Sequence, residues 1–460
     1  LIEGPDGVAI EEEGLAGHAH LRAVGGASSS RRWRGRPSIM VDLSAACGMP
    51  VRLLLEHPRM SMIQLLAVIA CLIPAAGALY WAVVTIRIAL HRGHRPSIRA
   101  GLELPEPPSG WPALSIIIPA HDESRVIDRC LGSLAAQRYP DLEIVVVLDR
   151  CTDDTPERVR RHAAADDRIR AVELDQCPPE WAGKCHAAHT GYRAARGDRL
   201  LFMDADTEAD PSLARAAVAF AAHHELALLS LLSTLTVEQP FEQGPRPVAT
   251  LTLMKMFPME QVNRRDGRRT FANGQFLLFD RVWYERLGTH EAVRDELLED
   301  LAFARRLRRM GGRGWIATAD RMLFCSMYGS VEAFRRGWKR IFIEACHRRV
   351  FKLRKWGVRT LLIGVVVPAG QVLATVLGLG LVFSRPTTAA VLLALVGLGL
   401  ALQYASLRYI YRRGGTPLRR LWRFPLGCVT VAGILLDAAD DLRHRRPIRW
   451  GGREYVLDPR

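Results

Sequence analysis

The stretch LLFMDADTEAD, residues 200–210, places an apolar run directly before the acids Asp204, Asp206, Glu208 and Asp210. The run has the composition of a buried strand, which has no use for clustered carboxylates. Like charges that are crowded together and desolvated raise each other's pKa and cost stability. Two explanations fit. Either the acids cap the next helix, with Pro211 in its first turn, or they hold a cation.

Composition and hydropathy indicate a membrane protein. The 460 residues leave room for two or three domains, and the formal net charge of +15 favours an anionic partner such as nucleic acid, a phosphate-bearing substrate or a membrane surface. Uncharged runs at 62–86, 361–383 and 387–407 are each long enough to cross a bilayer. The shorter run at 424–436 can span, re-enter or lie at the interface. Because the basic residues concentrate beside these runs, we expect a membrane partner and no nucleic acid.

The distribution of basic residues orients the chain. Arginines and lysines follow the first long run, precede the second and follow the third, whereas the turn between the second and third has only Arg385. The positive-inside rule then places the large middle segment in the cytoplasm. Nine cysteines without a CxxC pair fit reduced thiols in that compartment. We therefore expect a multi-pass protein of the cytoplasmic membrane.

The expected segments follow from these runs. We expect a disordered tail at 1–60, a membrane anchor at 61–87, a linker at 88–112 and a soluble domain at 113–334. After it come an interfacial amphipathic segment at 335–360, membrane helices at 361–383 and 387–407, a transmembrane or re-entrant segment at 421–437, and a basic cytoplasmic tail at 438–460. The chain begins with Leu1, and Met40 and Met60 are candidate translation starts.

Strand and helix patterns alternate through the soluble domain. Short apolar runs predict strands at 114–119, 143–148, 169–174 and 199–203. Helices with one apolar face are expected between them, the first capped by Asp122 or Ser124. Strands that are apolar on both faces and joined by helices imply a parallel sheet covered on both sides. Ligands bind beyond the carboxyl ends of such strands, so Asp149, Asp204 and Asp206 should face one crevice.

Four motifs agree, in order and spacing, with a known family. They are SIIIPAHDE (115–123), VVVLDRCTDDT (145–155), LLFMDADTEAD (200–210) and ELLEDLAFARRLRRMGGR (296–313). Together they resemble the signature of family 2 glycosyltransferases. CPPEWAGKC (177–185) is similar to a segment of the subgroup that includes hopanoid-associated and carotenoid-type membrane enzymes, and RWGGREYVLDP (449–459) resembles the tail of membrane members. The resemblance covers residues 114–349 and implies an α/β GT-A domain flanked by transmembrane helices.

The resemblance also implies roles for particular residues. Asp149 would contact the nucleotide, Asp206 with Asp204 would hold Mg²⁺ or Mn²⁺ on the diphosphate of a nucleotide-sugar donor, and Asp300 would be the general base. The remaining candidates are Asp122, Glu123, Lys184 and Asp204 on the donor side, and Asn273, Gly274, Glu299 and Trp338 on the acceptor side. Plainer explanations stay open, because Lys184 can be solvated, Glu299 and Asp300 can be first-turn helix acids, and Asn273-Gly274 can form a bulge.

The chemistry of sugar transfer needs these residue types. A departing diphosphate needs a Lewis acid, which a hard cation on carboxylate oxygens supplies. An acceptor hydroxyl needs one base opposite the leaving group, and a single displacement inverts the anomeric centre. The Gln-x-x-Arg-Trp motif of processive synthases is not met by RRGWKR, residues 335–340. We therefore expect an inverting enzyme that adds one sugar.

The membrane-flanking residues indicate the acceptor. Basic and aromatic residues at 335–359, and the methionine-rich stretch at 252–262, lie beside the expected membrane helices. Together with the resemblance they favour a lipid hydroxyl of isoprenoid type, although a plain membrane-flanking stretch and core methionines are the simpler explanations. The alternative function is a catalytically inactive relative that acts as a membrane scaffold or as a sugar-nucleotide-binding module.

Overall fold

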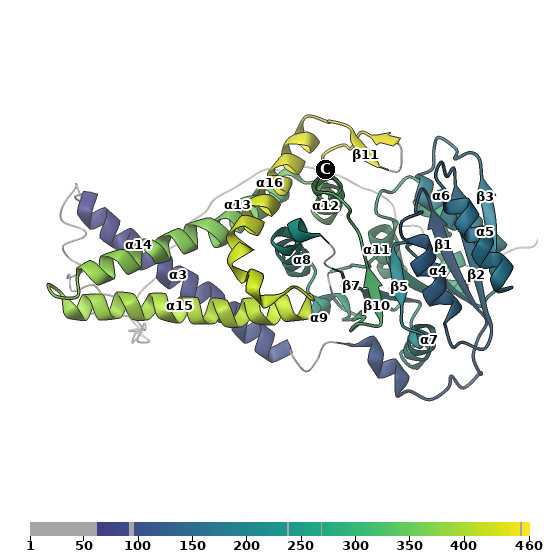
Figure 1. The fold of residues 1–460 in the computed structure, drawn as a ribbon, viewed down its shortest axis with the longest axis horizontal. Coiled ribbons are helices and arrows are strands. Elements are labelled where there is room, and N and C mark those ends of the chain that lie inside the picture. The colour runs from purple at the N-terminus through teal and green to yellow at the C-terminus, as the bar shows by residue number, and fades with distance from the viewer. Residues whose placement is uncertain (1–61, 92–95, 237–238, 268, 451–452) are drawn as a thin grey trace, which may run out of the picture.

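A computed structural model describes residues 62–91, 96–236, 239–267, 269–450 and 453–460. The expected tail at 1–60, with the candidate starts Met40 and Met60, lies outside these residues. The described chain consists of an α/β body and a set of long helices that project from one side of it (Figure 1).

A seven-stranded sheet forms the centre of the α/β body. Its strands, in spatial order, are β3 (Ile169–Leu174), β2 (Leu142–Asp149), β1 (Leu114–Ala120), β4 (Arg199–Met203), β8 (Phe276–Asp280), β6 (Leu228–Leu232) and β9 (Gly314–Thr318). Neighbouring strands are parallel, except that β8 is antiparallel to both β4 and β6. The four strands expected from apolar runs all form, and the α/β class with a mostly parallel sheet is confirmed.

Helices cover both faces of this sheet. Alternate residues of β1 point to opposite faces, and they pack against different helices. Ile116 and Ile118 share a core with α4 (Ile127–Ala135), α5 (Thr155–Ala165) and α7 (Leu213–His223). Ile117 belongs to a second core with α6 (Gly183–Ala194), α10 (Arg281–Arg286) and α11 (Glu299–Arg309). One local prediction is wrong: α4 begins after Val126 without a side-chain cap, so neither Asp122 nor Ser124 caps it.

Two smaller sheets complete the α/β body. β5 (Thr207–Ala209), β10 (Leu323–Cys325) and β7 (Thr234–Leu235) form a three-stranded sheet beside the end of β4. This sheet brings Cys325 next to the acids that follow β4, because β10 pairs Cys325 with Thr207. β11 (Ile448–Trp450) and β12 (Arg453–Tyr455) form a C-terminal hairpin.

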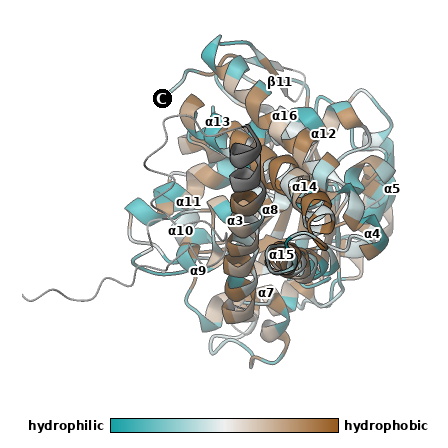
Figure 2. Ribbon diagram, turned by 90° about the vertical axis from the view of Figure 1, so that its left-hand side faces the viewer, coloured by the Kyte–Doolittle hydropathy of each residue, from teal (hydrophilic) through white to brown (hydrophobic). Residues whose placement is uncertain are grey.

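Among the residues that the structure describes, four helical segments are long and apolar enough to cross a membrane: 71–90, 350–381, 386–413 and 418–443. The first lies within α3 (Met62–His91), the second contains α14 (Val367–Gly380) and the third is α15 (Pro386–Arg413). These three helices project away from the sheet (Figure 1). Figure 2 looks onto this side and shows apolar residues along α3 and α14. Large apolar side chains such as Leu79, Val376 and Phe383 are exposed there. A surface of this kind fits contact with lipid.

The membrane-flanking helices differ from the expected segments. The expected interfacial segment at 335–360 is divided between α12 (Val331–Ala345) and α13 (Val350–Leu361), and α13 continues through a π-helical turn into α14. α16 (Phe424–Arg443) is longer than the apolar run in the sequence. It packs against α12, α13 and α8 (Pro245–Met256) instead of projecting with α3 (Figure 1). A short helix, α9 (Met259–Val262), follows α8 in the chain.

Candidate active site

The loop after β1 is held to the loop after β2. Asp122 has a left-handed backbone, with φ of 54°, and its Oδ1 accepts the Thr152 N–H at 2.6 Å and the Asp153 N–H at 3.2 Å. Asp153 in turn accepts the Ser124 N–H at 3.1 Å. These bonds make Asp122 an organiser of the loop that follows β2, and its expected contact with the donor stays a prediction.

Asp149 lies buried at the end of β2 and is paired with its sequence neighbour. Arg150 donates from Nε to Asp149 Oδ1 at 2.8 Å and from Nη2 to Oδ2 at 2.7 Å. These two bonds raise the pKa of the Arg150 guanidinium. Gly183 lies against the pair, because a Cβ there would be 2.9 Å from Asp149 Oδ2. This bidentate pair between neighbouring residues was not predicted from the sequence.

Lys184 joins two acids that are far apart in the sequence. Its Nζ lies 2.7 Å from Asp204 Oδ1 and 2.7 Å from Glu299 Oε1. Burial by itself lowers the pKa of Lys184, but the two carboxylates outweigh it, so the pKa is raised well above its usual value. Lys184 is therefore a fixed cation between the acids after β4 and the start of α11. The solvated-lysine explanation is wrong.

Asp206 follows β4 and has little positive charge near it. Its Oδ1 accepts the Cys325 thiol at 3.4 Å, and its backbone carbonyl accepts the Ser326 N–H at 3.0 Å. Burial, with the nearby charge of Asp204, raises the pKa of Asp206 to about 7. Burial and repulsion from Asp206 and Asp204 raise the pKa of Glu123 to about 8. The end of β4 therefore carries an excess of negative charge.

The acids after β4 include one carboxylate, Asp206, that could bind a divalent cation. Hard cations take carboxylate oxygens, and Asp206 offers such oxygens without an ion pair to a basic residue. Asp204 is engaged by Lys184 in this structure. Within the described residues, no group of three or more histidine, cysteine, aspartate or glutamate side chains is arranged as a metal site. The donor set is thus chemically suited to Mg²⁺ or Mn²⁺, with Asp206 as its most available member.

Asp300 lies at the start of α11, beside Gly274. Its Oδ2 accepts the Gly274 N–H at 2.7 Å, and its Oδ1 accepts the Leu301 N–H at 2.7 Å. Burial and the charge of Glu299 raise the pKa of Asp300 to about 7. Glu299 behaves oppositely: burial raises its pKa, but Lys184 outweighs this and leaves the pKa lowered. The pKa values of the two adjacent acids are thus shifted in opposite directions. Glu299 is ion-paired with Lys184, whereas Asp300 can take up a proton near neutral pH.

The backbone of Gly274 lies close to Lys184, Glu299 and Asp300. A Cβ at Gly274 would lie 3.2 Å from Lys184 Nζ and 3.3 Å from both Asp300 Oδ2 and Glu299 Oε1. These distances are tighter than ordinary contact, so the neighbours would have to move by a few tenths of an ångström. A side chain at position 274 would crowd Lys184, Asp300 and Glu299, so the glycine is explained by this space and not only by a bulge.

We therefore expect Gly274→Ala to lower kcat about tenfold while the protein stays folded, because small misplacements of catalytic groups are costly. Steady-state kinetics together with thermal unfolding would measure both effects. Gly132→Ala is the matched control, since nothing lies within 4 Å of a Cβ at Gly132. Equal activity of the two variants would show that the space at Gly274 is not needed for turnover.

The side chains of two expected acceptor-side residues, Asn273 and Trp338, are engaged in contacts within the fold. Asn273 donates from Nδ2 to the Leu231 carbonyl at 2.8 Å and to Gln275 at 3.0 Å. Trp338, in α12, is 3% exposed and packs between Phe334 and Phe342, with ring centroids 6.1 Å and 5.4 Å away. Both residues therefore stabilise the fold around the site, and their roles toward an acceptor stay predictions.

One cation near the site was not foreseen. Arg340 of α12 donates from Nη1 to the Leu297 carbonyl at 3.1 Å. Burial lowers the pKa of Arg340, while the nearby charges of Glu299, Asp300 and Asp204 oppose this change. The sequence contained Arg340 within RRGWKR, but helical spacing alone could not tell that this position faces the acids.

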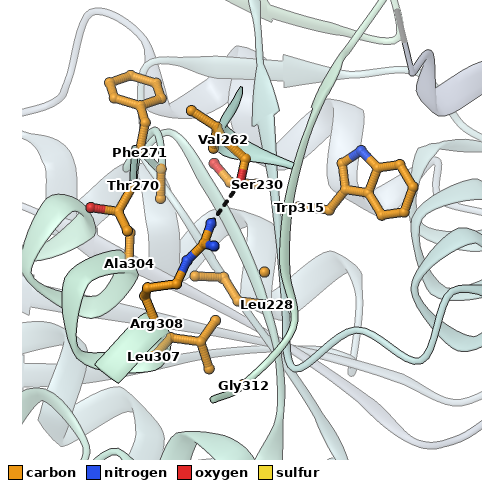
Figure 3. Close-up of a pocket in the computed structure, with 12 residues that line it drawn as sticks. Leu228, Ser230, Val262, Thr270, Phe271, Ala304, Leu307, Arg308, Gly312 and Trp315 are labelled. Carbon is orange, nitrogen blue, oxygen red and sulfur yellow. Dashed lines mark hydrogen bonds between the residues drawn. The ribbon is translucent and has the colours of Figure 1, made fainter. Parts of the chain in front are cut away.

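The cavity in Figure 3 is separate from these residues. It lies between β6, β9 and the later turns of α11, at Ala304, Leu307 and Arg308, and its volume of about 20 Å³ is roughly the room that one water needs. Arg308 fills its polar side by donating from Nη2 to the Val262 carbonyl at 2.9 Å. The cavity is a packing gap and not a substrate site.

Residues 115–288 match the family profile described as Glycosyl transferase family 2. This stretch is a family 2 glycosyl transferase domain. It runs from β1 to α10 and so includes Asp149, Lys184, Asp204, Asp206 and Gly274, whereas Asp300 lies beyond it. Together with the mostly parallel sheet, the match confirms the expected fold class, an α/β GT-A domain joined to helices that could span a membrane.

Curated relatives of the glycosyl transferase domain are similar over part of their length. A 4,4'-diaponeurosporenoate glycosyltransferase of Staphylococcus aureus is 29% identical over 198 residues, which are 41% of this chain and 50% of the relative. Glycosyltransferase AglD of Haloferax volcanii is 34% identical over 105 residues, 21% of this chain and 16% of the relative. The matches thus span half or less of the length of these relatives.

A solved structure is also similar to the chain. It is the mannosyltransferase PcManGT from Pyrobaculum calidifontis in complex with GDP-Man and Mn²⁺, with 20% identity and a TM-score of 0.46. The match covers 82% of this chain and 98% of that one.

Proposed function

We propose that this protein transfers one sugar from a nucleotide-diphosphate sugar to the hydroxyl group of an isoprenoid-type lipid, with inversion, at the cytoplasmic face of the membrane. One observation carries the proposal: Lys184 links Asp204, at the end of β4, to Glu299, next to Asp300. A cation-binding acid pair and a candidate base therefore lie on the two sides of one lysine.

The donor would lie along the carboxyl ends of β2 and β4. Asp149 would meet the nucleotide, and Asp206 with Asp204 would hold Mg²⁺ or Mn²⁺, which supplies Lewis-acid stabilisation of the diphosphate charge. Lys184 sits in the first turn of α6, where backbone N–H groups and the helix dipole favour phosphate. With Asp204 as a cation ligand, Lys184 would keep its bond to Glu299 and could donate to the leaving diphosphate.

Asp300 is suited to the role of base. Its carboxylate is held by two backbone N–H groups, so its direction is set before substrate arrives. It would accept the proton of the attacking hydroxyl on the side of the sugar opposite the diphosphate, and a single displacement of this kind inverts the anomeric carbon. Gly274 leaves the space in which these groups approach.

The acceptor is proposed from the membrane helices and one relative. The exposed apolar side chains of α3, α14 and α15 tie the catalytic domain to lipid, and one curated relative is named for transfer to diaponeurosporenoate. Incubating the purified protein with a radiolabelled nucleotide-sugar, Mn²⁺ and a membrane lipid extract tests the proposal. We expect label in the organic phase, lost on addition of a chelator. Label that stays entirely in the aqueous phase would contradict a lipid acceptor.

One measurement distinguishes the proposed enzyme from the alternative, an inactive scaffold or sugar-nucleotide-binding module. A binding module has no need of a positioned base, so it would bind the donor without hydrolysing it or transferring the sugar. Metal-dependent release of sugar from the donor in the absence of lipid would exclude this alternative.

The proposed topology leads to a further expected result. A reporter fused after Arg99, or inserted near Asp266, should report the cytoplasm, and one near Arg385 the opposite side. A fusion at Arg460 decides whether α16 crosses; we expect a cytoplasmic signal, because α16 packs on α8 and α12. Protection of the Asp266 reporter from a cytoplasmic label would contradict the orientation.

A further inference from the structure

Lys255 lies where the catalytic domain meets the membrane helices. It is near the C-terminal end of α8, which Figure 1 shows between the projecting helices and the sheet. Its Nζ donates to the hydroxyl of Tyr80 in α3, and the same atom lies 4.9 Å from the centre of the Tyr80 ring. The ammonium group is thus held by the phenol of an apolar helix, and it lies beyond the hydroxyl at the edge of the ring.

The charges around Lys255 are of one sign. The basic residues near Lys255 are Arg359 of α13 and Arg87 of α3. Both disfavour the protonated form of Lys255. Arg87 is paired with Glu260 at 3.0 Å. In the part of the chain that the structure describes, neither Lys255 nor Arg359 has a carboxylate within ion-pair distance. Arg359 instead lies 5.2 Å from the centre of the Trp356 ring.

A half-buried cation without a counter-ion is costly. Burial, together with Arg359, lowers the pKa of Lys255 to about 8, so the group is still mostly protonated at neutral pH. A second positive charge at Arg359 adds to the cost. An anion between the two would relieve both the repulsion and the missing hydrogen bonds, because Lys has three donors and only one of them is used on Tyr80.

The position of this cluster selects the kind of anion. Tyr80 and Arg359 both belong to segments that are apolar enough to cross a membrane, and Arg359 is near the basic start of the second one. Cationic pockets between helices at this level fit lipid head groups. A soluble anion would have to reach the same place past the exposed apolar surface of α3.

We propose that Lys255, the Tyr80 hydroxyl and the exposed Arg359 of α13 form a binding site for the phosphate of an anionic membrane lipid, where Lys255 of α8 meets Tyr80 of α3. The lipid completes the contact between the glycosyl transferase domain and the membrane helices. This site is independent of the sugar-transfer chemistry, so it stands or falls separately from the proposed function.

Native mass spectrometry of the full chain in detergent tests the site, with phosphatidylglycerol as the probe and phosphatidylcholine as the zwitterionic comparison. We expect phosphatidylglycerol to bind more tightly than phosphatidylcholine. Lys255→Met should weaken phosphatidylglycerol binding about fivefold, as expected for one basic residue near a lipid surface. Lys255→Arg should keep most of the binding, and Arg359→Gln, which leaves α8 unchanged, should weaken it as well.

Lys355→Met is the matched control, because Lys355 is exposed on the same helix as Arg359 and is not among the charged neighbours of Lys255. Binding that falls equally in Lys355→Met and Lys255→Met would show a general basic surface and overturn the proposal. So would unchanged binding in both Lys255→Met and Arg359→Gln, or full competition by soluble glycerol phosphate, which would show a site for free anions. Should Lys255→Met fail to fold, Arg359→Gln decides alone.

Discussion

Asp300→Asn should lower kcat by roughly 10²- to 10⁴-fold while donor binding survives, because the amide keeps the shape of the side chain but cannot accept a proton. The structure adds a stability effect. The Asp300 oxygens each accept a backbone N–H, from Gly274 and Leu301, and an amide has only one such oxygen. One buried N–H loses its acceptor, at a cost of about 1–3 kcal/mol. Single-turnover kinetics, donor titration and thermal unfolding separate these effects.

Asp295→Asn is the control, since Asp295 is exposed and lies outside the cluster. Loss of donor binding in Asp300→Asn at an unchanged unfolding temperature would place Asp300 on the donor side and remove it as the base. The wild-type pH profile gives a second check. A base with a pKa of about 7 is protonated and inactive below that pH, so kcat/KM should fall as the pH drops below 7. An ordinary aspartate would give this fall near about pH 4.

Asp206→Ala should abolish metal-dependent turnover and metal-dependent donor binding while membrane insertion is unchanged. The carboxylate of Asp206 is the most available oxygen donor at the end of β4, and it makes only a weak bond to the Cys325 thiol. Removing it leaves Asp204, which is engaged by Lys184. Titration of Mn²⁺ into the purified protein, followed by donor binding and turnover, measures the effect.

Glu208→Gln is the matched control, because Glu208 lies two residues further along the chain, is exposed, and has a distant ion pair with Arg129 at 3.9 Å. The control should titrate with Mn²⁺ like the wild type. Full activity in Asp206→Ala would contradict the cation role of the acids after β4. Asp204→Ala should also be inactive, and in addition it would release Lys184 to pair with Glu299 alone.

The strands and their acids were predictable from local sequence. Apolar runs predicted β1, β2 and β4 with nearly their final bounds, because a strand buried on both faces is apolar along its length. β3 was also predicted, although it is only partly buried. The sharp change from Met203 to Asp204 also marked the carboxyl edge of the sheet. The order of strands was not predictable, since β8 enters antiparallel between β4 and β6 through contacts distant in sequence.

The pairing of charges was decided by the tertiary structure alone. Lys184 contacts Asp204 and Glu299 only because α6 and α11 pack on the same face of the sheet. No periodicity links positions this far apart. Trp338 shows the same limit for apolar residues. A helix with one apolar face has the same sequence pattern whether that face meets a membrane or a protein core, and here α12 turns Trp338 into the core against Phe342.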